Sequence, residues 1–125
     1  MGSKEDSMES VLSLKADAFS VRIINMVKYL NANADKGMKP LFTQILRSGT
    51  SISANIGEAQ YAQTKADFVT KLHISLKEAS ETRKWLQMLT ESEVISSVQS
   101  KSMNADLDEL FAMLVSSIKT VKNNI

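Results

Sequence analysis

The chain has no cysteine, one proline and only four glycines among its 125 residues. The lack of cysteine excludes disulfide bonds, thiolate metal ligands and cysteine nucleophiles together. So few prolines and glycines argue against a disordered or turn-rich chain. The length suits a single domain, and we expect residues 1–10 to form a flexible N-terminal segment and residues 11–125 to form the folded domain.

An excess of charge of one sign is also missing, because 15 basic and 14 acidic side chains leave a net charge of +1. A chain with this balance has no global field that attracts nucleic acid, so any polyanion site must be local. No apolar run approaches the ~20 residues that span a membrane, and the N-terminus is too polar for a signal peptide. These absences predict a cytoplasmic protein.

The sequence does contain four segments of helical periodicity. Apolar residues recur at alternating steps of four and three in residues 12–30, 40–61, 64–89 and 103–122. Gly37 and Pro40 separate the first two segments, Thr64 can cap the third, and residues 91–100 are predicted to form a loop. This pattern predicts an all-α fold, an antiparallel up-down-up-down four-helix bundle with short connections.

Two segments carry more apolar surface than one bundle core requires. In the first segment, Val21, Ile24 and Val27 widen an already continuous apolar stripe. In the third, Ile74, Trp85 and Met88 lie about a third of a turn from the core seam. Tryptophan is enriched at interfaces where one edge of the ring stays wet, so these three residues form a candidate subunit interface.

The second segment has a smooth side formed by Gly49, Ser53 and Gly57, which recur every four residues. Small residues on one line allow another backbone to approach closely. The seam of the third segment is small and polar at its centre, in residues 75–82. We therefore expect the smooth side of the second helix to pack against the third.

Polar side chains on the second and third segments form a candidate buried polar network: Arg47, Asn55, Glu58, Glu78 and Glu81. A ligand pocket is the alternative, but a network is favoured because buried charges must be paired. In particular, Arg47 is predicted to pair with a carboxylate of the third helix and to fix the register of the two helices.

The third segment also has a basic side, formed by Lys71, Lys77, Arg83 and Lys84. These residues are the candidate nucleic-acid contact. No aromatic residue lies among them on which bases could stack, so a solvated face is the favoured interpretation. Contact with RNA phosphates is the alternative.

Catalytic and metal-binding patterns are not evident. The only histidine, His73, is not part of a Glu-x-x-His pair of the kind found in di-iron bundles. Ser48, Ser51 and Ser53 are not paired with a base in any recognisable motif, and small hydroxyls in a helix commonly bond to the preceding turn. We expect no catalytic residue, no metal, no cofactor and no enzymatic activity.

An ordered set of residues resembles a known family. The set comprises residues 47–52, 54–56, 58–59, 65–68, 71–72, 76–79, 81–82 and 85–86. In this order the residues resemble the bacterial four helix bundle proteins, also called the 23S ribosomal RNA intervening-sequence proteins. The resemblance covers residues 11–122 and is strongest in the second and third helical segments.

The resemblance implies an up-down-up-down bundle that assembles into a homopentameric ring and has no established enzymatic activity. A sister branch of the family acts as the accessory protein of diversity-generating retroelements, in which a strongly basic pentamer binds a reverse transcriptase and nucleic acid. This chain departs from that branch because its net charge is only +1. A scaffold or adaptor for a protein or ribonucleoprotein partner is therefore favoured, with nucleic-acid binding as the alternative.

Overall fold

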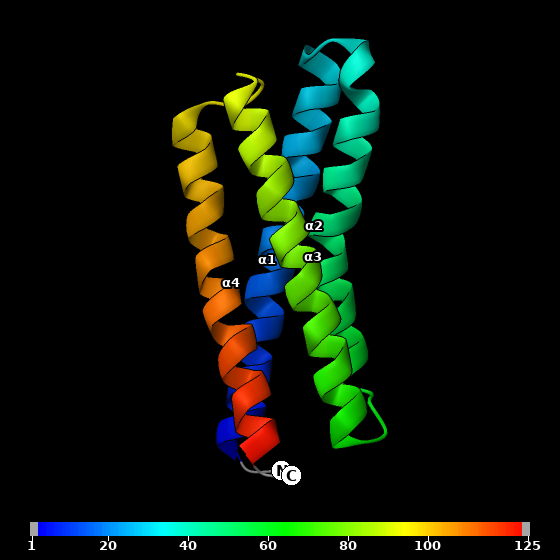
Figure 1. Ribbon diagram of the computed structural model, residues 1–125, viewed down its shortest axis with the longest axis vertical. Helices are drawn as coiled ribbons and strands as arrows, with labels where there is room; N and C mark the ends of the chain where they lie inside the picture. The colour runs from blue at the N-terminus through cyan, green and yellow to red at the C-terminus, as the bar shows by residue number, and fades with distance from the viewer. Residues whose placement is uncertain (1–2, 124–125) are drawn as a thin grey trace.

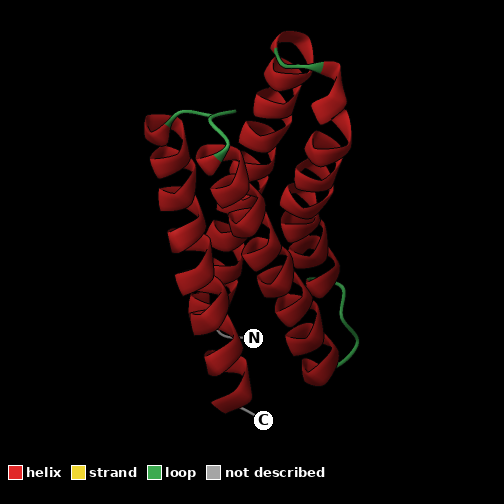
Figure 2. Ribbon diagram, turned by 45° about the horizontal axis from the view of Figure 1, so that its top comes forward, coloured by secondary structure: helices red, strands yellow, loops and turns green. Residues whose placement is uncertain are grey.

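The structure is a computed structural model that describes the backbone of residues 3–123 and the side chains of residues 11–123. Its elements are α1 (Ser3–Asn33), the 3-10 helix η1 (Lys36–Met38), α2 (Lys39–Ala59), α3 (Lys65–Glu91) and α4 (Ser97–Asn123). The long helices alternate in direction, and the start of α1 and the end of α4 lie at the same end of the bundle (Figure 1). The described residues form helices and loops without a strand (Figure 2). The predicted all-α four-helix fold is confirmed.

The flexible segment predicted at residues 1–10 lies outside the described side chains. The backbone of α1 already begins within this segment, at Ser3.

Helix ends follow local capping chemistry. Pro40 lies in the first turn of α2, where a missing backbone N–H costs nothing. The Thr64 hydroxyl accepts a hydrogen bond of 3.0 Å from the backbone N–H of Asp67, so the predicted cap of α3 is present. The loop predicted at residues 91–100 is too long, because α4 begins at Ser97 and the Ser96 hydroxyl caps the backbone N–H of Gln99 at 3.1 Å.

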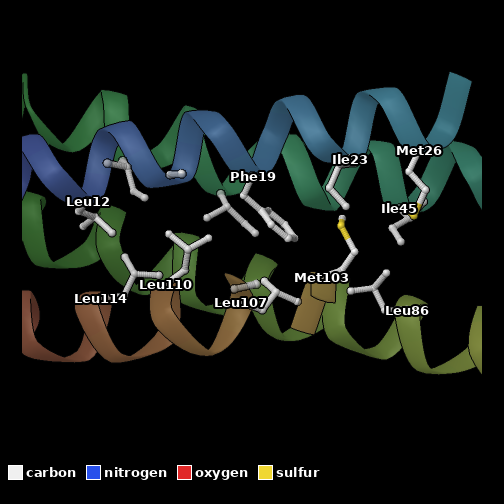
Figure 3. Packing of buried hydrophobic residues seen from close by; sticks show 14 of the residues in the cluster. Leu12, Phe19, Ile23, Met26, Ile45, Leu86, Met103, Leu107, Leu110 and Leu114 are labelled. Carbon is white, nitrogen blue, oxygen red and sulfur yellow. The ribbon is translucent and has the colours of Figure 1, made fainter. Parts of the chain in front are cut away.

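The core runs along the bundle axis and is built from the predicted apolar stripes. In Figure 3, Leu12 and Ile23 of α1 point toward Leu114 and Met103 of α4. This order is the one that antiparallel helices require. All four side chains are almost completely buried.

The smooth side of α2 packs against α1, so the predicted contact with α3 is wrong. A Cβ atom built on Gly49 would lie 2.8 Å from the Ile23 side chain of α1. The Ser53 hydroxyl, one turn further along, donates to Asp17 of α1. Gly57 has nothing within 4 Å of a built Cβ, so this glycine is not needed for close packing.

Hydroxyls of the α3 seam instead meet the neighbouring line of α2. The Thr82 hydroxyl lies 2.9 Å from that of Ser48, and the Ser75 hydroxyl donates to the Ile52 carbonyl at 2.8 Å. All of these polar atoms are buried, and each bond satisfies a group that would otherwise destabilise the core.

Ion pairs attach α4 to both of its neighbours. Arg22 of α1 pairs with Asp106 at 2.5 Å, and Lys15 pairs with Glu109. On the other side, Arg83 of α3 pairs with Asp108 at 2.6 Å. These pairs are partly exposed, so each contributes little to stability.

No helix within residues 3–123 combines the length and the apolar character that crossing a lipid bilayer requires.

Candidate interaction surfaces

A polar cluster lies where α2 and α3 meet on the outside of the bundle. The Arg47 guanidinium of α2 donates to Glu78 at 3.1 Å and also to Glu81, both on α3. The Glu81 oxygen that accepts from Arg47 also accepts from the indole N–H of Trp85 at 3.1 Å. Glu78 and Glu81 are one turn apart and Trp85 follows after one more turn, so helical spacing alone aligns all three beside α2.

The cluster shifts the pKa values of Glu81 and Arg47 in opposite directions, and both shifts favour the charged form. The hydrogen bond from Trp85 has the largest effect and lowers the pKa of the Glu81 carboxyl. Burial opposes it, and Arg47 and Lys77 lower the pKa further. The hydrogen bond to Glu81, together with the charge of Glu78, raises the pKa of the Arg47 guanidinium. At neutral pH the cluster therefore holds one cation between two carboxylates.

The prediction that Arg47 pairs with a carboxylate of the third helix agrees with this geometry, but the prediction of a buried network is wrong. The Arg47 side chain is 46% exposed, and only Glu78, at 16%, is well covered. Asn55 donates instead to the Ser51 carbonyl of its own helix at 2.8 Å. Glu58 is exposed, about three turns beyond Arg47 along α2. The role of Arg47 in helix register stays a prediction.

The three residues of the candidate subunit interface on α3 differ in their exposure. Trp85 is half-buried and packs against the core, while Ile74 and Met88 are exposed. Together with Glu78 and Glu81 they form one continuous row at steps of four and three. Below, "the α3 row" means Ile74, Glu78, Glu81, Trp85 and Met88.

The basic residues of α3 do not act as one group. Arg83 points to the other side of the helix, where it pairs with Asp108 and lies 4.8 Å from the centre of the Phe111 ring. Lys77 and Lys84 are exposed next to the α3 row, and Lys71 is half-buried. The structure therefore separates Arg83 from Lys77 and Lys84, and Lys71 lies on a third side of the helix.

The outer side of α1 exposes large apolar side chains. Leu14 is 68% exposed, Val21 is 54% exposed and Ile24 is 40% exposed, whereas Val27 is buried. Leu14 and Val21 are seven residues apart, so they lie on one line, and Ile24 lies one turn beyond Val21. Below, "the α1 face" means Leu14, Val21 and Ile24. Sequence reasoning missed Leu14, although its spacing from Val21 was a usable signal.

The serines and the histidine lie apart from any catalytic arrangement among the described residues. Ser48 is buried against Thr82, Ser51 donates to the Arg47 carbonyl at 2.6 Å, and His73 is exposed. No group of three or more acidic or histidine side chains that could hold a metal ion occurs among the described side chains.

Two open clefts lie over the seam between α1 and α4. The larger, of about 340 Å³, is lined by Arg22, Asn25, Met26, Tyr29, Gln99 and Met103. The smaller, of about 150 Å³, lies beside the Lys15–Glu109 pair. In the smaller cleft, Lys15 and Glu109 neutralise each other. In the larger cleft, the charge of Arg22 is neutralised by Asp106.

Comparisons with known proteins agree with this architecture. A model of the family described as "23S rRNA-intervening sequence protein" matches residues 9–116. The crystal structure of a protein of unknown function from the S23 ribosomal protein family of Bacteroides thetaiotaomicron VPI-5482 is similar, with a TM-score of 0.83 and 45% sequence identity. The match covers 90% of this chain and 98% of that one. A search of curated proteins found no match. The chain belongs to the 23S rRNA-intervening sequence protein family.

Proposed function

We propose that the protein is a non-enzymatic scaffold or adaptor that acts as a homo-oligomer and presents a surface to a protein or ribonucleoprotein partner. The subunit count that the resemblance implies, and that we propose, is five. The observation that supports assembly is the α1 face, where Leu14, Val21 and Ile24 are exposed on one helix.

Exposed apolar side chains are common when they occur singly, but aligned ones signal an interaction site. Burial of an exposed leucine or valine side chain contributes about 1.5–3 kcal/mol. These side chains project from a rigid helix, so little conformational entropy is lost on association. The α1 face is therefore well suited to hold copies of the chain together.

Light scattering coupled to size exclusion tests the proposal. We expect the parent protein to elute as a single species of five 13.8-kDa chains, about 69 kDa. The double substitution Leu14→Glu and Val21→Glu places charges in the contact, so this variant should elute as a smaller species with unchanged helical circular dichroism.

Tyr61→Glu is the matched control, because Tyr61 is the most exposed large apolar residue in the described chain and lies in the α2–α3 connection. This variant should keep the mass of the parent. A monomeric parent at high concentration would contradict self-assembly, and an oligomer that survives the Leu14 and Val21 substitutions would contradict the use of the α1 face.

Nucleic-acid binding is the second candidate function, supported by the exposed Lys77 and Lys84. Two observations weaken it. Arg83 is occupied by Asp108, and Glu78 and Glu81 place carboxylates beside the lysines. A polyanion would have to approach those carboxylates closely. Titration of an RNA oligonucleotide at low and moderate salt tests this candidate, and the absence of salt-dependent binding would contradict it.

A further inference from the structure

We infer that copies of the chain associate head to tail, with the α1 face of one subunit packed on the α3 row of the next. The inference rests on the self-assembly proposed above and specifies which two surfaces meet, so the occupant of the α3 row is a second copy of this chain. It draws on the positions of α1 and α3 in the bundle, on the levels of the two surfaces along its axis and on the pairing of the charges around them.

The two helices that carry these surfaces occupy opposite corners of the bundle, since α1 and α3 each pack against α2 and α4. Both surfaces expose large apolar side chains, and they lie on different sides of the subunit, where one chain cannot use one to cover the other. A contact between two α1 faces would leave the α3 row exposed. A head-to-tail contact covers both surfaces at one interface and repeats from copy to copy.

Contacts through α2 show which parts of α1 and α3 lie at the same level along the bundle. Ser53 of α2 donates a hydrogen bond to Asp17 of α1. The carbonyl of the neighbouring Ile52 accepts a hydrogen bond from Ser75 of α3. Asp17 and Ser75 are therefore about level with each other.

A second pair is level about two turns further along. Gly49 of α2 lies against the side chain of Ile23 of α1. The hydroxyl of the neighbouring Ser48 lies 2.9 Å from that of Thr82 of α3. Ile23 and Thr82 are therefore about level as well.

The apolar side chains of the two surfaces follow these levels. Leu14 and Ile74 lie just before the first pair, and Ile24 and Trp85 lie just after the second. At ~1.5 Å per residue, each apolar residue of α1 is level with its counterpart on α3 to within about 3 Å. The α1 face and the α3 row therefore match in height.

The directions of the helices match too, because α1 and α3 run the same way along the bundle (Figure 1). Rotation of a subunit about an axis parallel to the bundle changes neither level nor direction. Such a rotation can therefore bring α1 of one copy beside α3 of the next, with Leu14 opposite Ile74 and Ile24 opposite Trp85.

The charges around the two surfaces do not oppose this contact. Next to the α1 face, Lys15 and Arg22 are paired with acidic residues of α4. Within the α3 row, Glu78 and Glu81 are both paired with Arg47. Each of these charges keeps its partner when α1 of another copy covers the row, so the contact leaves none of them buried alone.

Thiol crosslinking tests the contact directly, because the protein has no cysteine of its own. In the double variant Leu14→Cys with Ile74→Cys, thiols of adjacent subunits should face each other, and a short bis-maleimide should give a ladder of covalent oligomers on a denaturing gel. Each single variant should stay monomeric on the gel. Leu14→Cys with Met88→Cys is the matched control and should give no ladder, since Met88 lies about 21 Å from Ile74 along α3.

Three outcomes of the crosslinking would overturn the inference. Covalent dimers of the single variant Leu14→Cys would show that two α1 faces meet. A ladder from the Met88 control as strong as that from the Ile74 pair would contradict the matched levels. The absence of a ladder from a double variant that light scattering shows to be oligomeric would exclude the contact itself.

Trp85 provides a second measurement, because it is the only tryptophan of the protein. In Leu14→Glu with Val21→Glu, the neighbouring subunit should leave the α3 row, so the indole gains contact with water and its emission should shift to longer wavelength. The substituted residues lie on a different side of their own chain, so the shift reports on the neighbour. Tyr61→Glu should leave the emission unchanged. An unchanged emission in the dissociated Leu14 and Val21 variant would overturn the inference.

Light scattering of the parent separates this inference from the proposed assembly. An oligomeric parent whose double variant gives no crosslink between Leu14 and Ile74 positions would contradict the use of the α3 row alone. A monomeric parent would contradict self-assembly, and the head-to-tail contact with it.

Discussion

At the scale of single residues, the polar cluster of Arg47, Glu78, Glu81 and Trp85 shows how one carboxylate oxygen can connect two helices. Glu81 accepts from Arg47 of α2 and from Trp85 of its own helix. Trp85 therefore helps to keep Glu81 ionised, and the ionised carboxylate holds Arg47 in place. The cluster is partly exposed, so we expect it to orient side chains more than to stabilise the fold.

Replacing Trp85 by Phe should raise the pKa of Glu81, because the indole hydrogen bond is the largest influence that lowers it. A carboxyl whose pKa is lower in the folded protein stabilises the fold above its unfolded pKa and loses that effect as the pH falls through the folded pKa. In the variant, this loss should be smaller than in the parent and should be complete at a higher pH, because the folded pKa lies closer to the unfolded one. Carboxyl carbon NMR measures the titration of Glu81 directly.

Arg47→Met provides the comparison for that titration, since it also removes a group that lowers the pKa of Glu81. Both variants should shift the Glu81 titration upward. An unchanged Glu81 titration in the Trp85 variant would mean that the indole bond does not influence the carboxyl. Chemical denaturation of the two variants at several pH values then shows whether the acid loss of stability follows.

At the scale of helices, the close approach of α1 and α2 depends on one glycine. Gly49→Ala should destabilise the protein by about 1–3 kcal/mol, because the new methyl group would meet Ile23 at 2.8 Å and force it to move. Gly57→Ala is the matched control in the same helix, where a Cβ atom meets nothing within 4 Å. It should stabilise by about 0.5–1 kcal/mol through helix propensity.

Urea unfolding of the two variants, at one protein concentration, measures the difference. If Gly49→Ala were as stable as Gly57→Ala, α1 and α2 would have to move apart at Ile23 with no loss of unfolding free energy. The close packing of Gly49 on Ile23 would then not contribute to stability.

The same pair of glycines shows what the sequence can and cannot predict about helix packing. The 4-3 spacing correctly predicted four helices and the residues of the core, and the residue type at Thr64 correctly predicted the cap of α3. It placed Gly49 and Ser53 on one line but could not say which neighbour the line meets, because every helix of a bundle has two neighbours. The ion pairs between α1 and α4 were missed for the same reason, since charges more than 80 residues apart, such as Arg22 and Asp106, have no sequence spacing to reveal them.

At the scale of the whole molecule, assembly should couple stability to concentration. If copies of the chain associate through the α1 face, the folded oligomer is favoured by mass action and the Tm should rise with protein concentration. Leu14→Glu with Val21→Glu should remove this dependence. Differential scanning calorimetry over a wide range of concentrations measures both, and a Tm that is constant in the parent would contradict coupled assembly and folding.

The surfaces were predicted less completely than the fold. Trp85, Ile74 and Met88 could be grouped from helical spacing, because a row that is not the core seam must face outward or sideways. The exposure of Arg47 could not be predicted, since a polar stripe has the same pattern whether it is buried or lies at the outer edge of two helices. The pattern places Ile24 and Val27 in the same wider stripe, and only the structure shows that Ile24 is exposed and Val27 is buried.

The start of α1 and the end of α4 lie at one end of the bundle, opposite the α1–α2 and α3–α4 connections (Figure 1). A passenger domain fused to either end would therefore emerge from the same pole of each subunit. In a ring whose bundle axes run parallel to the ring axis, such passengers would crowd one rim and leave the opposite rim bare, and an engineer could use this polarity to decorate a surface in one orientation.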